Sequence, residues 1–264
     1  MLNSVDDGAR ELLKDTVVAL SQFPNIEYVI IGGWCPVLRN KSSIQHPGTL
    51  DVDVLFRHSN DPGYLSEIIK QLIKFEFIPS AKHPFQLLKK QSINGNNLIY
   101  NIDLLHPKML EDKKFTGTFV DHLELDIPLN SEEQLLKKVC SIVLPNSEVI
   151  FQKQMYSLEK IDGHSLPLVS FEGMFITKMD SCQKQKRERD SFDIYLAFLN
   201  DGINLDSISN LSNIDDRIRM SLDSFKKYLA EKAVEFDKNV KHFGDSIQGS
   251  PAQFVLSNLS RQPK

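Results

Sequence analysis

The sequence has no long hydrophobic run and only three cysteines, and both shortages exclude classes of protein. No apolar stretch reaches the roughly 20 residues that a membrane-spanning helix needs, and the amino terminus lacks the basic and apolar regions of a signal peptide. The cysteines show neither a zinc-binding nor a CxxC spacing, which is typical of reduced thiols rather than a disulfide framework. We therefore expect a cytoplasmic protein with no membrane contact.

An excess of positive charge is also missing. The chain carries 31 lysine and arginine residues against 35 aspartate and glutamate residues, a formal net charge of −4. A protein with this balance has no general attraction for nucleic acid, so a polyanionic partner would have to meet a local basic patch. The 264 residues, 41% of them hydrophobic, suffice for one large domain or two small ones with a well-buried core.

The hydrophobic pattern predicts an α+β fold, with a mixed β-sheet and flanking helices followed by a helical lobe. The change of pattern falls between residues 125 and 170, and we divide the chain into an α/β core over 1–125 and a lobe over 126–264. Strands are expected over 27–31, 50–56, 85–90, 98–105, 149–158 and 165–169. Helices are expected over 4–22, 33–39, 61–75, 131–140, 171–182, 187–199 and 214–242, with a short last helix after 251. Ser4 is expected to cap the first of these helices.

Three aspartates stand inside the expected apolar strands. Asp51 and Asp53 are two apart, so they point to the same face of strand 50–56. Asp103 lies in strand 98–105, which the turn sequence Asn94-Gly95-Asn96-Asn97 predicts to be antiparallel to strand 85–90. Burying an unpaired carboxylate is costly, and structure alone gives no reason to place three here. A D-x-D pair by itself is common and often merely solvated, which is the alternative interpretation.

Carboxylate oxygens are the ligands that Mg²⁺ prefers, and two such ions can promote an in-line displacement at phosphorus. We therefore expect Asp51, Asp53 and Asp103 to hold two Mg²⁺ ions. Gly32 and Gly33 follow strand 27–31 and would let the backbone approach a triphosphate, beside free N–H groups at the next helix start. The alternative for the glycine pair is an ordinary tight turn.

A second group of candidate residues lies in the C-terminal half. Lys178 stands in an otherwise apolar turn, from which it could reach the β- or γ-phosphate as a point charge. Asp190 and Asp193 are three apart and share a helix face, so either could orient that lysine or the acceptor. The segment between Lys178 and Asp190 has the charge pattern of a solvated surface, with Lys184, Lys186, Arg187 and Glu188.

These motifs resemble the nucleotidyltransferase superfamily, whose signature is an apolar strand, a Gly-Gly or Gly-Ser pair, D-x-D and a third acidic residue on a later strand. More narrowly, the chain resembles the AbiEii and MenT-type toxins of bacterial toxin–antitoxin and abortive-infection systems. The matching positions are Gly32-Gly33, Thr49-Leu50-Asp51-Val52-Asp53, Asp103, Lys178 and Arg189-Asp190-Ser191-Phe192-Asp193. His46, Pro47 and Gly48 stand where such toxins often have a basic residue before the threonine.

The resemblance implies an enzyme that transfers a nucleoside monophosphate from an NTP to an acceptor. In MenT-type relatives the acceptor is the 3′ end of tRNA, and a cognate antitoxin is the expected partner. The residues expected to act in catalysis are Asp51, Asp53, Asp103, Lys178 and Asp190. Those expected to bind the NTP are Gly32, Gly33, Thr49, Lys178 and Asp193.

Two other functions stay open on the sequence alone. The same chemistry could modify a small molecule, such as an aminoglycoside, or a partner protein. The chain could also be a non-catalytic module that binds a nucleotide or RNA, although three intact acidic residues argue against it. The histidines, His46 among them, have no zinc-site spacing, and we interpret them as loop or strand-end residues.

Overall fold

The computed structural model describes residues 4–23, 27–57, 62–80, 82–107, 119–122, 138–244 and 246–260. Its strands are β1 (Tyr28–Ile31), β2 (Asp51–Phe56), β3 (Ile78–Pro79), β4 (Gln86–Ile93), β5 (Asn96–Pro107), β6 (Phe119–His122), β7 (Lys138–Leu144), β8 (Tyr156–Ile161) and β9 (His164–Val169). Its α-helices are α1 (Val5–Ser21), α2 (Trp34–Arg39), α3 (Pro62–Lys74), α4 (Glu148–Gln152), α5 (Phe171–Lys178), α6 (Glu188–Leu199), α7 (Leu205–Ile214), α8 (Asp216–Glu231), α9 (Ala233–His242) and α10 (Pro251–Leu259).

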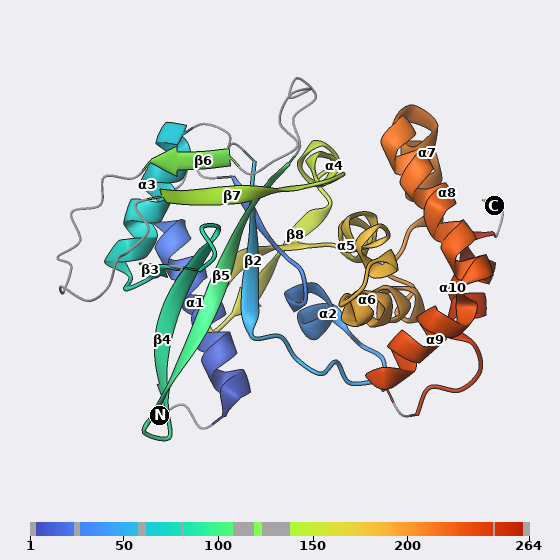
Figure 1. Ribbon diagram of the computed structural model, residues 1–264, viewed down its shortest axis with the longest axis horizontal. Helices are drawn as coiled ribbons and strands as arrows, with labels where there is room; N and C mark the ends of the chain where they lie inside the picture. Colours follow the sequence, from blue (N-terminus) through green and yellow to red (C-terminus); the bar gives the residue numbers. More distant parts are fainter. Residues whose placement is uncertain are drawn as a thin grey trace.

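The described strands form one mixed sheet in the order β3-β4-β5-β2-β1-β9-β8, with β7 added beside β5 and β6 beside β7. Figure 1 shows this sheet on one side and the helices from α5 to α10 gathered on the other. The predicted α+β class, with flanking helices and a helical C-terminal region, is confirmed. Because β7, β8 and β9 belong to the same sheet as β1, the sheet continues past residue 125, and the division there stays a prediction.

The two faces of the sheet are buried in two separate hydrophobic clusters, as alternating side chains require. Ile30, Val52 and Val54 point to the face that α1 and α3 cover. Ile31 and Leu55 point to the opposite face and join a cluster with the helical lobe. Asp51 and Asp53 therefore belong to the face that the lobe packs against, and Asp51 is the first residue of β2.

Several local predictions are confirmed by their capping and turn contacts. Ser4 caps α1: its hydroxyl accepts a hydrogen bond from the Asp7 amide at 3.1 Å, and the Asp7 carboxylate accepts one from the Ser4 amide at 3.0 Å. The turn at Asn94 and Gly95 joins β4 and β5 as an antiparallel hairpin, and both turn residues have positive φ angles. Among the described residues, no helix is both long and apolar enough to cross a membrane.

Other element predictions are wrong. The strand predicted over 149–158 begins with helix α4, because a short apolar run does not distinguish a buried strand from a buried helix. The helix predicted over 214–242 breaks at Lys232 into α8 and α9. Helix α7 was not predicted, although Asn204 caps it. Of the helix predicted over 131–140, residues 138–140 are in β7, and residues 131–137 lie outside the described residues.

Candidate active site

The three predicted carboxylates meet because β2 and β5 are parallel neighbours in register. Asp53 is paired with Asp103, and Asp51 is paired with Asn101 two residues earlier. Paired residues on adjacent strands point to the same face, so the three carboxylates form one group. We call Asp51, Asp53 and Asp103 the acidic row.

Two amide side chains hold Asp103 in place. Its Oδ1 accepts hydrogen bonds from Gln86 Nε2 at 2.9 Å and from Asn101 Nδ2 at 2.8 Å. Gln86 lies directly across from Asp103 in the hairpin, and Asn101 lies two residues before it on the same face. Burial nevertheless raises the pKa of Asp103, and the charge of Asp51 adds to the effect while these two hydrogen bonds oppose it.

Asp53 is the most perturbed carboxylate of the acidic row. Burial raises its pKa to about 7, and the negative charges of Asp51 and Asp103 contribute in the same direction. The positive charges of Lys178 and Arg189 lower it again. Like charges held this close are unfavourable without a cation, so the arrangement suits a bound positive ion.

The two glycines bring the backbone against the acidic row. Gly32 has a φ of +72°, and a Cβ built on it would clash with the Asp53 carboxylate. A Cβ on Gly33 would lie 2.8 Å from the Thr49 hydroxyl. Thr49 in turn donates a hydrogen bond from Oγ1 to Asp51 Oδ1 at 2.7 Å. Glycine is therefore required at both positions for this close packing.

Lys178 and the two α6 aspartates form a second buried group. Lys178 Nζ donates hydrogen bonds to Asp190 Oδ1 at 2.8 Å and to Asp193 Oδ2. Ser181 Oγ donates to the other Asp190 oxygen at 2.7 Å. Burial opposes the charge on Lys178, but the two carboxylates outweigh it and raise the lysine pKa. Both aspartates orient the lysine, and its ammonium group is held between them.

His46 connects this buried group to the loop that carries Thr49. Its Nε2 lies 2.9 Å from Asp193 Oδ1, and the Gly48 amide donates a hydrogen bond to its Nδ1 at 3.0 Å. Since Nδ1 accepts, the proton is on Nε2, which donates to the carboxylate. Burial would raise the pKa of Asp193, but the Lys178 charge and the His46 hydrogen bond outweigh it, so this pKa is lowered.

Arg189 is the cation that comes nearest to the acidic row from α6. Its Nη2 lies 4.0 Å from Asp51 Oδ1, and its Nη1 donates to the Gly48 carbonyl at 3.4 Å. The charges of Arg189 and Lys178 both act on Asp53. The structure thus places the two predicted groups on facing elements, the acidic row on β2 and β5 and the Lys178 group on α5 and α6.

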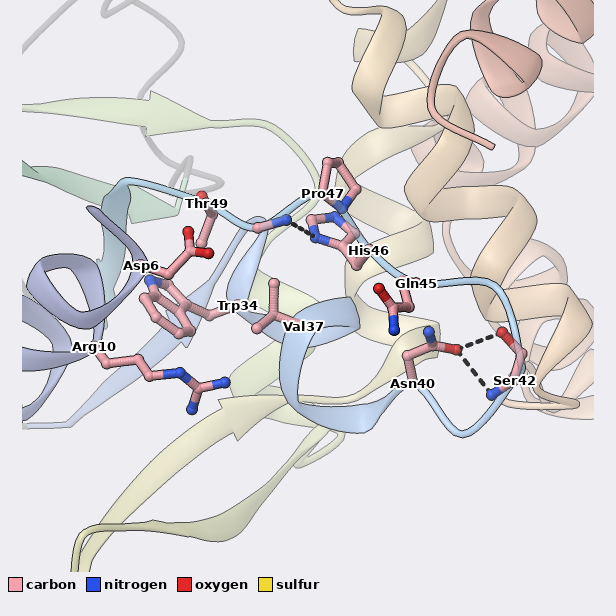
Figure 2. Close-up of a pocket in the computed structure, with 11 residues that line it drawn as sticks. Asp6, Arg10, Trp34, Val37, Asn40, Ser42, Gln45, His46, Pro47 and Thr49 are labelled. Carbon is pink, nitrogen blue, oxygen red and sulfur yellow. Dashed lines mark hydrogen bonds between the residues drawn. The ribbon is translucent and has the colours of Figure 1, made fainter. Parts of the chain in front are cut away.

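A cavity of about 400 Å³ borders the loop that carries Thr49 (Figure 2). Asp6 and Arg10 of α1 line one wall, Trp34 and Val37 of α2 the next, and residues 40–49 close it. Trp34 also donates from its indole nitrogen to the Asp51 carbonyl at 2.8 Å. Thr49 also lines the cavity, and it bonds to the Asp51 side chain.

The acidic row offers only oxygen donors, which is the chemistry that Mg²⁺ requires. In the part of the chain that is described, no three histidine, cysteine, aspartate or glutamate side chains are grouped closely enough to hold an ion as they stand. Asp53 faces the Gly32 backbone, and Asp103 is turned by its two amide partners. The oxygen donors and the raised carboxylate pKa values suit Mg²⁺. To bind the ion, the side chains of Asp53 and Asp103 would have to rotate toward a common point.

Comparison with known proteins gives structural neighbours, among them the two that follow. No family model and no curated protein sequence matches the chain. One neighbour is the crystal structure of an antigenic nucleotidyltransferase-like protein from Paracoccidioides brasiliensis, with 16% identity, 91% of this chain and 94% of that chain covered, and a TM-score of 0.44. The other is the solution structure of the antibiotic-resistance factor ANT(2'')-Ia, with 13% identity, 87% and 96% covered, and a TM-score of 0.35. The AbiEii and MenT-type subgroup stays a prediction.

Three contributors to the site were not singled out from the sequence. Gln86 meets Asp103 only through the strand register, and no local signal points to it. His46 was interpreted as a loop residue, and its bond to Asp193 spans 147 positions. Asn101 had a usable signal, because it stands two residues before Asp103 on the same strand.

Proposed function

We propose that the protein is a Mg²⁺-dependent nucleotidyltransferase. The observation that carries the proposal is the pairing of Asp53 with Asp103 on neighbouring strands, with Asp51 on the same face. Burial and the negative charges of Asp51 and Asp103 raise the pKa of Asp53 to about 7. A bound cation would therefore stabilise the acidic row. A purely structural role would not account for three neighbouring acidic side chains on one face of the sheet.

In the proposed reaction, Asp51, Asp53 and Asp103 hold the metal, and Gly32 and Gly33 leave room for the triphosphate. The acceptor hydroxyl oxygen forms a bond to the α-phosphorus, the bond to the bridging oxygen breaks, and pyrophosphate leaves with that electron pair. We place Asp103 on the acceptor side, where it would favour loss of the hydroxyl proton to solvent water. Bound Mg²⁺ would neutralise charge and polarise the phosphoryl oxygens.

For Lys178 we propose a part played mainly at a distance, and the direct phosphate contact expected from the sequence stays a prediction. Its ammonium group is held by Asp190 and Asp193, and its side chain is 9% exposed. It would therefore act on the reaction through its charge, which already lowers the pKa of Asp53, and by fixing α6. Asp190 and Asp193 already use two of the three Lys178 N–H donors, so only the third could contact a phosphate.

The acceptor that we propose is RNA, with tRNA as the particular acceptor that the AbiEii and MenT-type resemblance implies. In that case the protein acts as a toxin that stops translation, and a neutralising antitoxin is its partner. The support for this finer assignment is the sequence resemblance at Thr49, Asp51, Asp53, Lys178 and Asp190.

The direct test measures transfer of label from each α-labelled NTP into RNA, protein and small molecules. The wild-type protein is compared with Asp53→Ala and with Asp223→Asn, which changes an exposed aspartate on α8. We expect Mg²⁺-dependent labelling of RNA by the wild type and by Asp223→Asn, and background labelling by Asp53→Ala. Equal labelling by all three proteins would refute the proposal. Label in protein or in a small molecule would keep the activity and reject the RNA acceptor.

The toxin role is tested separately. Induced expression of the wild-type chain in a bacterial host should arrest growth, and expression of Asp53→Ala at the same level should not. If both proteins arrest growth equally, the toxicity does not come from the acidic row, and the toxin assignment by this activity is wrong.

A further inference from the structure

A short basic segment leads into α6 beside the acidic row. The basic segment is residues 184–189, Lys184-Gln185-Lys186-Arg187-Glu188-Arg189. It holds four cations and one carboxylate, a net charge of +3, in a chain whose formal net charge is −4. All its residues except Arg189 are exposed. The segment is therefore a local reversal of the protein's overall charge.

Three of the four cations in the basic segment are not neutralised by any nearby carboxylate that the structure describes. Across the described residues, Lys184, Lys186 and Arg187 form no ion pair within 4.0 Å. The next two acidic residues along the chain, Asp190 and Asp193, point inward to Lys178. Lys184, Lys186 and Arg187 are exposed and are therefore available to a negatively charged partner.

The position of the segment connects it to the reaction site. Arg189, its last residue, comes within 4.0 Å of Asp51 and acts on the pKa of Asp53. Arg187 is the N-cap residue of α6 and makes no side-chain capping hydrogen bond, so no side chain of its own satisfies the first amides of this 12-residue helix. The Asp190 amide is already bonded to the Arg187 carbonyl, so the clustered cations are what favours a bound anion here.

We propose that the basic segment binds the phosphate backbone of an RNA acceptor and directs its end to the acidic row. The inference rests on the proposed function, since it names the surface that would bring the acceptor to that site. A chain with a negative net charge and a carboxylate-lined site repels a polyanion, so an RNA needs cations on the path to the reacting atoms. Lys184, Lys186 and Arg187 supply them at the rim, and Arg189 supplies one beside the carboxylates.

The test measures binding without catalysis. A fluorescent single-stranded oligoribonucleotide is titrated with protein at several salt concentrations, without NTP, and anisotropy gives the dissociation constant. The test variant is Lys184→Gln, Lys186→Gln and Arg187→Gln combined. The control variant is Lys74→Gln, Lys153→Gln and Lys160→Gln combined, which removes the same charge from exposed positions on α3, after α4 and on β8.

Three lost phosphate contacts should reduce the slope of log affinity against log salt by about 2, since each contact on a single strand contributes about 0.7. The control variant should keep the wild-type slope. An equal reduction of this slope in both variants, or no reduction in the test variant, would overturn the inference. So would tighter binding to a polyglutamate peptide than to RNA at the same salt concentration, because the surface would then prefer an acidic protein.

A second measurement separates this inference from the proposed function. With labelled NTP, the test variant should need a higher RNA concentration for half-maximal transfer while its half-saturating NTP concentration is unchanged. If RNA binding depends on the segment but no protein transfers label, the inference stands and the proposed function fails. If label enters RNA and the test variant matches the control in both measurements, the proposed function stands and the inference fails.

Discussion

Replacing Asp53 with asparagine should stabilise the protein in the absence of metal, although it removes a proposed catalytic group. Asparagine has nearly the same shape and cannot ionise. The wild-type carboxylate is crowded by Asp51 and Asp103, and its pKa rises to about 7 in the folded protein. In the unfolded chain it should return to its ordinary value near 4, approximately 3.9 in model peptides.

The sign and size of the effect follow from this difference. The folded state binds the proton more tightly than the unfolded state, so stability falls as pH rises from about 4 through about 7. A shift of about three pKa units corresponds to at most about 4 kcal/mol, and access of water to this half-buried side chain reduces it to about 2 kcal/mol. Asp53→Asn should therefore match the wild type near pH 4 and exceed its free energy of unfolding by about 2 kcal/mol near pH 8.

Urea unfolding in the presence of EDTA, at about pH 4 and about pH 8, measures the difference. Asp223→Asn, on the surface of α8, is the control and should match the wild type at both pH values. If Asp53→Asn is no more stable than the wild type near pH 8, the carboxylates of the acidic row do not repel one another as the structure indicates, and the argument for a cation site loses its physical basis.

Three further predictions concern the acidic row, Lys178 and Gly32. Added Mg²⁺ should raise the thermal midpoint of the wild type more than that of Asp53→Asn, and equal shifts measured by calorimetry would contradict the proposed metal site. Lys178→Met should lower the free energy of unfolding by about 3–5 kcal/mol in urea titrations, because Asp190 and Asp193 lose their buried cation; a loss below about 1 kcal/mol would show that the pair is solvated. Gly32→Ala should abolish label transfer and destabilise the fold by at least about 1 kcal/mol, since its φ is +72°, and an active, equally stable variant would contradict this packing.

The acidic row shows how far local patterns reach. Alternation along a strand placed Asp51 and Asp53 on one face, and the Asn94-Gly95 turn correctly predicted that β5 returns antiparallel to β4. Neither pattern predicts that β5 also pairs in parallel with β2, which brings Asp103 beside Asp53. That pairing depends on the order of strands in the sheet, which is a property of the whole chain.

The errors have similar physical causes. The run at 149–151 is apolar and buried, but its neighbours decide whether it is a strand or a helix, and here it forms α4. The helical pattern over 214–242 continues through Lys232, yet packing divides it into α8 and α9. Periodicity reports which side chains are buried, and it reports less well where the backbone changes direction.

By itself, the sequence determined the α+β class, the cap of α1, the hairpin before Asp103 and the residue types at the candidate site, because each depends on neighbours a few positions apart. Only the tertiary structure decided that Asp103 meets Asp53, that Asp190 and Asp193 both hold Lys178, and that His46 joins Asp193 across 147 positions. These contacts join segments distant in the chain, and strand order and helix packing set them rather than any local preference.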